Sequence, residues 1–190
     1  MTLLLNWFVC AALLGPGCTA MSPSAPTRPE GPSEAGEAHG FVRSCESSVF
    51  GDLGAGWRRD AVITGPAAFL ARGYEDDSKR LFRTRPGRAT AFKVLLVITG
   101  DRPITVSVRT PGAALFYNPS KWGPSNHVSF RAGDEVTRFE PCRGPDQPST
   151  QFNGAFLVRR PMCVPVEVRV GDEDPVLVSL SFGMGKCPAS

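Results

Sequence analysis

The sequence predicts an all-β protein, an antiparallel β-sandwich or flattened barrel of about seven to nine strands with two disulfides. Three observations support this fold class. Short segments that alternate between apolar and polar residues recur along the chain. Turn-forming residues separate them, since the 190-residue chain contains 20 glycines and 18 prolines. Four cysteines lie in the same region of the chain, enough for two disulfides.

The clearest strand signals lie near the carboxyl terminus. Residues 164–170 carry valine at every second position, and residues 176–182 alternate in the same way. Residues 171–175, Gly-Asp-Glu-Asp-Pro, join the two segments as a hairpin turn. Because proline has no N–H to donate, Pro165 indicates that its strand is a sheet edge at that point or only begins there.

Further strands are expected earlier in the chain. Residues 92–98 are apolar on both faces, which is typical of a central strand, and residues 104–108 alternate after a turn at 100–103. Weaker strand signals occupy residues 60–63, 67–71, 113–117, 127–131, 136–139 and 155–159. Only residues 76–81 could form a short helix, so the pattern favours a sandwich or barrel.

A predicted hairpin suggests how the cysteines pair. With Cys10 and Cys18 near the amino terminus, the cysteines left for disulfides are Cys45, Cys142, Cys163 and Cys187. Asn153-Gly154 between apolar residues is a strong signal for a two-residue turn, and this turn would bring Cys142 almost opposite Cys163. We therefore expect Cys142–Cys163 and, by elimination, Cys45–Cys187. The chain has no Cys-x-x-Cys pair, so we expect no metal site.

The amino terminus predicts export. Residues 3–14 form an apolar run shorter than the roughly 20 residues that a membrane-spanning helix needs. Cleavage after Ala20 would make residues 1–20 a signal peptide and release a secreted protein. Alternatively, Cys18 is the lipid acceptor of a lipoprotein at the outer face of the cytoplasmic membrane. Residues 21–40, rich in Pro, Ser and Glu, are expected to be a disordered tether before a folded domain at 41–190.

Residues 115–127 are the best candidate for a binding site. They combine aromatic, amide and lysine side chains on a segment rich in Pro and Gly, and such groups can stack on a ligand and form hydrogen bonds with it. The candidate binding residues are Tyr117, Asn118, Lys121, Trp122 and Asn126. Alternatively, Trp122 folds back and closes the end of the sandwich.

The sequence carries no catalytic signature, and we assign no catalytic residue. His127 is the only histidine of the domain, and no Gly-x-Ser-x-Gly motif accompanies it. The formal net charge is only +3, and no basic block is interleaved with aromatic residues, which argues against a nucleic-acid partner. We expect no cofactor, and contact with a membrane only through a lipid on Cys18.

Two longer stretches carry a resemblance. They are "GDLGAGWRRDAVITGPAAFL" at 51–70 and "TQFNGAFLVRRPMCVPVEVRVGDEDPVLVSLSFGMGKC" at 150–187. With the amino-terminal features, they resemble a group of small exported proteins of actinomycete bacteria, over most of residues 45–187. The resemblance implies export, a bacterial origin and paired cysteines. It carries over no functional residue.

The expected function is that of a non-enzymatic binding or structural module at the bacterial cell envelope. Its partner would be a cell-wall glycan or an envelope protein. One alternative is an envelope-active hydrolase whose carboxylates are dispersed in the sequence, because a catalytic pair needs only closeness in space. A second alternative is an exported sensor or accessory domain of a membrane partner.

Overall fold

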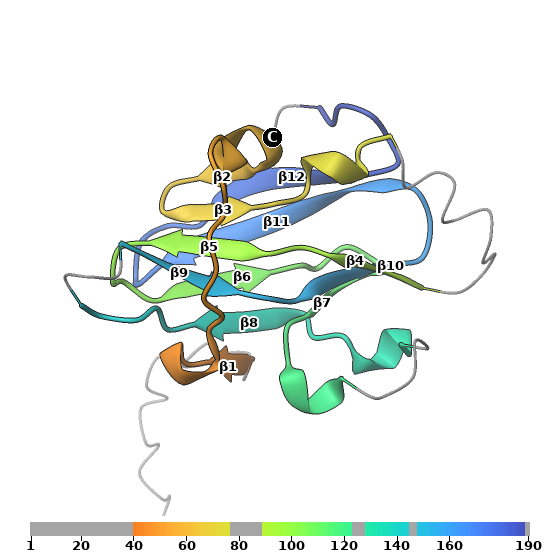
Figure 1. Ribbon diagram of the computed structural model, residues 1–190. Helices are drawn as coiled ribbons and strands as arrows, with labels where there is room; N and C mark the ends of the chain where they lie inside the picture. Colours follow the sequence, from red (N-terminus) through yellow and green to blue (C-terminus); the bar gives the residue numbers. More distant parts are fainter. Residues whose placement is uncertain (1–39, 77–88, 123–127, 145–147, 189–190) are drawn as a thin grey trace, which may run out of the picture. The chain divides into compact units, whose positions relative to one another are not determined.

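Alternating apolar and polar residues build a five-stranded sheet that forms one layer of the protein (Figure 1). The computed structural model describes residues 40–76, 89–122, 128–144 and 148–188. In spatial order the strands of this sheet are β1 (Phe41–Arg43), β8 (Val136–Phe139), β6 (Ile104–Ser107), β11 (Met162–Val170) and β12 (Val176–Phe182). Neighbouring strands are antiparallel, except that β1 and β8 run parallel.

Two smaller sheets form the other layer. One contains, in spatial order, β2 (Val62–Thr64), β3 (Ala67–Phe69), β5 (Leu96–Thr99) and β9 (Ser149–Phe152). The other contains β4 (Thr90–Lys93), β10 (Ala155–Val158) and β7 (Ala113–Phe116). These two smaller sheets are continuous in register, because β4 leads directly into β5 and β9 leads directly into β10. Lys93 of β4 lies opposite Ala155 of β10, and Leu96 of β5 lies opposite Phe152 of β9. At the junction, the Val94 amide donates to the Gly154 carbonyl over 3.0 Å.

The two layers bury a common apolar core. Four aromatic rings contact one another in series across it, with centroid distances of 5.0 to 6.2 Å: Phe69, Phe156, Phe182 and Phe92. Each buried aromatic side chain removes roughly 150–250 Å² of surface from water, so these rings contribute strongly to stability.

Segments with short 3₁₀-helices cover the outer faces of the smaller sheets. The segment with η2 (Trp57–Asp60) packs on β3 and β5, and the segment with η5 (Phe130–Ala132) packs on β7 and β10. The other 3₁₀-helices are η1 (Cys45–Ser47), η3 (Arg72–Tyr74) and η4 (Pro119–Lys121). The described residues form no α-helix, and none of their helices has the length and hydrophobicity to cross a membrane.

The all-β antiparallel sandwich is confirmed, although the described residues form 12 strands, more than expected. The expected strand at 92–98 is divided into β4 and β5, while β1 and β9 carry too little alternation to be predicted. The strand expected at 127–131 is wrong, because its described part runs into the 3₁₀-helix η5. The helix expected at 76–81 lies, apart from Asp76, outside the described residues.

The β11–β12 hairpin is confirmed. Val168 lies opposite Val176, and Gly171 enters the turn with a φ of 54°. Pro165 pairs only with β12, because β6 pairs with β11 from Glu167 onward. The strand is therefore an edge at Pro165, as the missing N–H requires.

The expected disulfides are wrong. The structure joins Cys45 to Cys142 and Cys163 to Cys187, with Cα–Cα distances of 4.7 and 5.8 Å. The error lies in the Asn153-Gly154 turn, which does not form a hairpin. The chain instead passes from β9, which pairs with β5, to β10, which pairs with β4 and β7. Cys142 is therefore not folded back onto Cys163.

The observed pairs follow from the strand order. The parallel register of β1 and β8 sets Arg43 beside Phe139, so Cys45 and Cys142 follow on adjacent, similarly directed chains. Beyond β12, the chain turns at Gly183 and Gly185, both with positive φ, and returns Cys187 to β11 at Cys163. Two disulfides indicate an oxidising environment.

The described residues belong to one compact unit, Glu37–Ser190. The expected signal peptide, the lipid-acceptor candidate Cys18 and nearly all of the expected tether lie outside the described residues.

Candidate ligand-binding groove

Trp122 is positioned by η4, the 3₁₀-helix that follows β7. Asn118 caps this helix, because its side-chain oxygen accepts hydrogen bonds from the Ser120 amide at 3.0 Å and the Ser120 hydroxyl at 2.7 Å. Pro119 occupies the first helical position, where its missing N–H does no harm. Asn118 is thus a buried cap rather than a ligand-facing amide, which corrects its expected role.

Lys121 holds η4 against the segment before β8. Its Nζ lies 2.6 Å from Oδ1 of Asp134, and both side chains are partly buried. The amide of Asp134 also donates to Leu115 of β7 over 2.8 Å. This ion pair therefore fixes the loop that presents Trp122, and Lys121 is engaged within the protein.

Tyr117 lies inside the sandwich, and its expected role as a ligand-stacking ring is wrong. Its exposed fraction is 0%, and its hydroxyl donates to the Val94 carbonyl over 2.8 Å. The ring meets Phe139 and Phe156 edge-on at centroid distances of 5.2 and 6.2 Å. Burial raises the pKa of its hydroxyl, so the side chain stays neutral.

Arg43 lies behind Trp122 and is 1% exposed. Its N–H groups donate to the carbonyls of Tyr117 at 2.6 Å, Asn153 at 3.0 Å and Ser47 at 2.5 Å. They also donate to the Ser47 hydroxyl at 2.9 Å and, more weakly, to Oδ1 of Asn153 at 3.4 Å. All five donors of the guanidinium are thereby used, although no described carboxylate pairs with it.

The charge of Arg43 is stabilised by oxygen dipoles and by aromatic faces. Its guanidinium carbon lies 5.8 Å from the ring centre of Trp122 and 5.5 Å from that of Phe152. Burial lowers the pKa of the guanidinium, while Tyr117 acts in the opposite direction. Arginine remains charged in proteins, so the group supports Trp122 as a buried cation.

A shallow groove of about 310 Å³ lies beside Trp122. Its floor is the outer face of the three-stranded sheet, where Lys93, Ala155 and Phe116 sit side by side on β4, β10 and β7. Trp122 and Asn153 also line it, and Trp122 keeps 38% of its surface exposed. Trp122 therefore packs toward Arg43 and still offers part of its ring to the groove.

Of the four candidate binding residues that the structure describes, only Trp122 lines this groove. Asn126 lies outside the described residues. Sequence reasoning missed Phe116, Lys93 and Asn153, which line the groove, and Arg43, which supports it. Residues 113–117 are all apolar, so no alternation assigned Phe116 to the outer face, and no local signal links Arg43 to Trp122.

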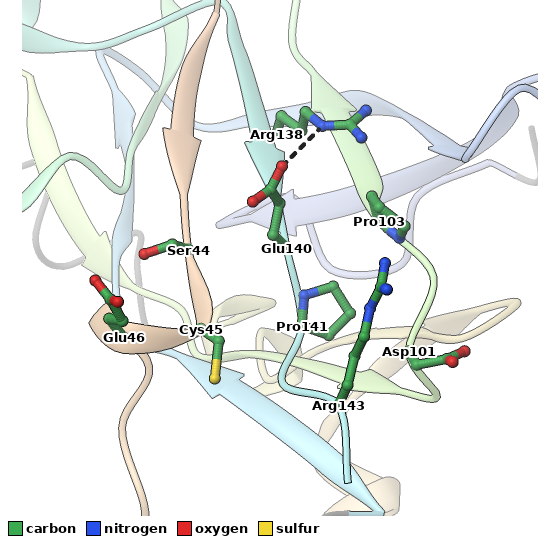
Figure 2. Close-up of a pocket in the computed structure, with 9 residues that line it drawn as sticks. All are labelled: Ser44, Cys45, Glu46, Asp101, Pro103, Arg138, Glu140, Pro141 and Arg143. Atoms are coloured by element: carbon green, nitrogen blue, oxygen red, sulfur yellow. Dashed lines mark ion pairs between the residues drawn. The ribbon is translucent and has the colours of Figure 1, made fainter.

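A second hollow, of about 490 Å³, is lined in part by Cys45 (Figure 2). Figure 2 shows Arg138 and Glu140 of the β8 segment turned toward each other. The Nε atom of Arg138 lies 3.5 Å from Oε1 of Glu140. Both side chains are about half exposed. Surface pairs of this kind contribute little energy, and charges of both signs line the hollow, so it selects no ligand class.

The described residues contain no group of three or more side chains that could hold a metal ion. No model of a known protein family, no curated protein and no solved structure matches the chain. The geometry of the groove beside Trp122 is the basis for the function proposed below.

Proposed function

We propose that this protein is an exported, non-enzymatic binding module of the bacterial cell envelope and that the groove beside Trp122 holds a glycan. The observation that carries the proposal is Trp122 itself, which keeps 38% of its surface exposed although it is held from behind by Arg43. A rigid, partly exposed indole face suits the apolar face of a sugar ring, while its edge can form polar contacts.

The size of the groove favours a sugar over a protein. Its volume of about 310 Å³ is at the lower end of ligand sites, which hold roughly 300–1,000 Å³. A stable protein interface buries about 800 Å² on each partner and needs a broader surface. One or two sugar rings fit this scale.

The lining of the groove favours binding over catalysis. Glycoside hydrolysis requires two carboxyl groups on either side of the scissile bond. Within the part of the chain that the structure describes, the residues that line the groove include neither aspartate nor glutamate. A glycan held there would be bound and released unchanged.

Export is supported by independent features. The two disulfides require an oxidising compartment to form and persist. The apolar run at 3–14, the small residues up to Ala20 and the resemblance to exported actinomycete proteins favour the outer side of the cytoplasmic membrane.

The proposal is tested by titrating the protein with a panel of cell-wall and model oligosaccharides. Binding is measured by calorimetry and by tryptophan fluorescence. We expect at least one glycan to bind, and Trp122→Ala to weaken that binding about tenfold or more because the stacking surface is lost. Trp122→Phe should retain part of the affinity, since it keeps an aromatic face.

Trp57 supplies the matched control. Its side chain packs on the outer face of the other small sheet, with Arg58 5.0 Å from its ring centre. Trp57→Phe should bind as tightly as the unchanged protein, and the fluorescence change should persist in that variant. If Trp122→Ala binds every glycan as well as the unchanged protein, the groove is not the site.

A further inference from the structure

We propose that the glycan held beside Trp122 is anionic, and that Lys93 recognises its negative charge. This inference rests on the proposed function and specifies the class of ligand. It follows from a mismatch between hydrogen-bond donors and acceptors in the groove, from the position of Lys93, and from the buried charge of Arg43.

The groove offers donors to a ligand. Lys93, Asn153 and Trp122 line it, and the lysine ammonium, amide nitrogen and indole nitrogen of these side chains all donate hydrogen bonds. Among the described residues that line the groove there is no aspartate or glutamate, and Lys93 forms no ion pair with a described carboxylate. A ligand that supplies acceptor groups and a counter-charge would therefore complement these donors.

Three backbone acceptors at the groove are already used. The Gly154 carbonyl accepts from the Val94 amide at 3.0 Å, and the Asn153 carbonyl accepts from Arg43 at 3.0 Å. The Lys93 carbonyl accepts from the Tyr74 hydroxyl at 2.6 Å. These bonds reduce the number of acceptors that the groove can offer to a ligand, while its side-chain donors stay available.

Arg43 strengthens the bias in two ways. A guanidinium can only donate, so Oδ1 of Asn153 must be the amide atom that faces Arg43, at 3.4 Å, and the amide nitrogen remains available to a ligand. Arg43 is also a buried cation whose charge is met by oxygen dipoles but by no described carboxylate, so a net positive charge remains near Trp122. Both effects favour an anion beside Trp122.

Lys93 is placed to meet that anion. It lies on β4, an edge strand of the three-stranded sheet, directly across from Ala155 and in one row with Phe116. Because Ala155 has a short side chain, the groove is shallow in its middle, and Lys93, Phe116 and Trp122 line it around that point. A sugar stacked on Trp122 would thus direct an acidic substituent toward the ammonium group.

A lysine ammonium is a compact point charge that can bind either a carboxylate or a phosphate. The test therefore compares three probes: an oligogalacturonate, its methyl-esterified form, which has the same sugar backbone without the charges, and a phosphomannan. Calorimetry is carried out with the purified oxidised protein. Binding of oligogalacturonate alone identifies a carboxylated glycan, and binding of phosphomannan alone identifies a phosphorylated one.

We expect an anionic probe to bind more tightly than the esterified one, by a factor of about ten or more, because charge-assisted hydrogen bonds are among the stronger polar contacts. The difference should shrink as salt rises from about 20 mM to about 500 mM, since screening weakens exposed charge pairs. Lys93→Gln should remove the preference for the charged probe without reducing the binding of the esterified probe. Lys186→Gln, on an exposed lysine beside a different hollow, should change neither.

The possible failures are distinguishable. If charged and esterified probes bind equally and Lys93→Gln changes nothing, the charge assignment is overturned while glycan binding stands. If neither those probes nor any neutral glycan binds, the proposed function fails and this inference fails with it.

Discussion

Gly154 illustrates how one residue type serves two different physical needs. After an asparagine, a glycine is usually interpreted as the residue that supplies positive φ in a tight turn. In this protein, a Cβ at residue 154 would lie 2.2 Å from Cδ1 of the Tyr117 ring. The glycine is therefore required because a buried ring approaches the backbone closely.

Gly154→Ala should lower the free energy of unfolding by about 1–3 kcal/mol, because the Tyr117 ring must move within a packed core. Guanidinium unfolding of the oxidised protein measures the change. Gly51→Ala is the matched control, since residue 51 is exposed and a Cβ there meets no atom within 4 Å. Equal losses in the two variants would contradict the close-approach explanation.

Arg43 is a residue whose burial could not be predicted from its neighbours in the sequence. Its sequence context, Phe-Val-Arg-Ser, resembles that of any surface arginine. Its burial depends on three carbonyls and two side-chain oxygens from three separate segments of the chain. Residue type alone cannot reveal such a set of partners.

At the scale of elements, strand existence is a local property and strand pairing is not. The alternation in β11 and β12, with the turn between them, was sufficient to predict a hairpin because the partners are neighbours in sequence. In contrast, the sequence around Asn153-Gly154 is typical of a hairpin between β9 and β10, yet these two strands do not pair with each other. β9 pairs with β5, and β10 pairs with β4 and β7. Pairing with strands far away in the sequence therefore replaced the local hairpin.

The disulfides give a prediction at this scale. Cys45–Cys142 closes a loop with a sequence separation of 97, and Cys163–Cys187 one of 24. Loop-entropy reasoning gives about 4.7 kcal/mol for the first and about 3.4 kcal/mol for the second. Cys45→Ala with Cys142→Ala should therefore destabilise the protein by about 1 kcal/mol more than Cys163→Ala with Cys187→Ala.

Chemical unfolding of the two double variants measures this difference. Peptide mapping of the non-reduced protein provides an independent check and should recover a Cys45–Cys142 peptide. Recovery of a Cys142–Cys163 peptide instead would contradict the strand order around β1 and β8.

At the scale of the molecule, the two layers of sheet enclose one apolar core, and further segments cover outer faces of the sheets. The segments with η2 and η5 bury the outer apolar faces of the smaller sheets. The groove beside Trp122 lies on the same outer face, where Phe116 of β7 and Ala155 of β10 meet Lys93 of β4. The candidate site is thus built on the face of a sheet and bordered by a loop.

Export is tested on the full chain. Expression with residues 1–20 in an actinomycete host should give a mature protein that begins at Met21, because small residues precede the expected cleavage point. Amino-terminal sequencing and labelling with a fatty-acid analogue separate the two routes. A labelled product beginning at Cys18 would replace the secreted form with a lipoprotein, and an unprocessed product would contradict export.

The sequence by itself determined the fold class, because period-two alternation, turn residues and an even set of cysteines are local or compositional properties. It also indicated the loop that carries Trp122, since residues 115–127 are rich in Pro and Gly. Only the tertiary structure decided which cysteines meet, that Tyr117 is a core residue, and that Arg43, Lys93 and Asn153 gather near Trp122. Those outcomes depend on contacts between segments far apart in the chain, and the packing of the two layers selects such contacts from many that the local pattern allows equally well.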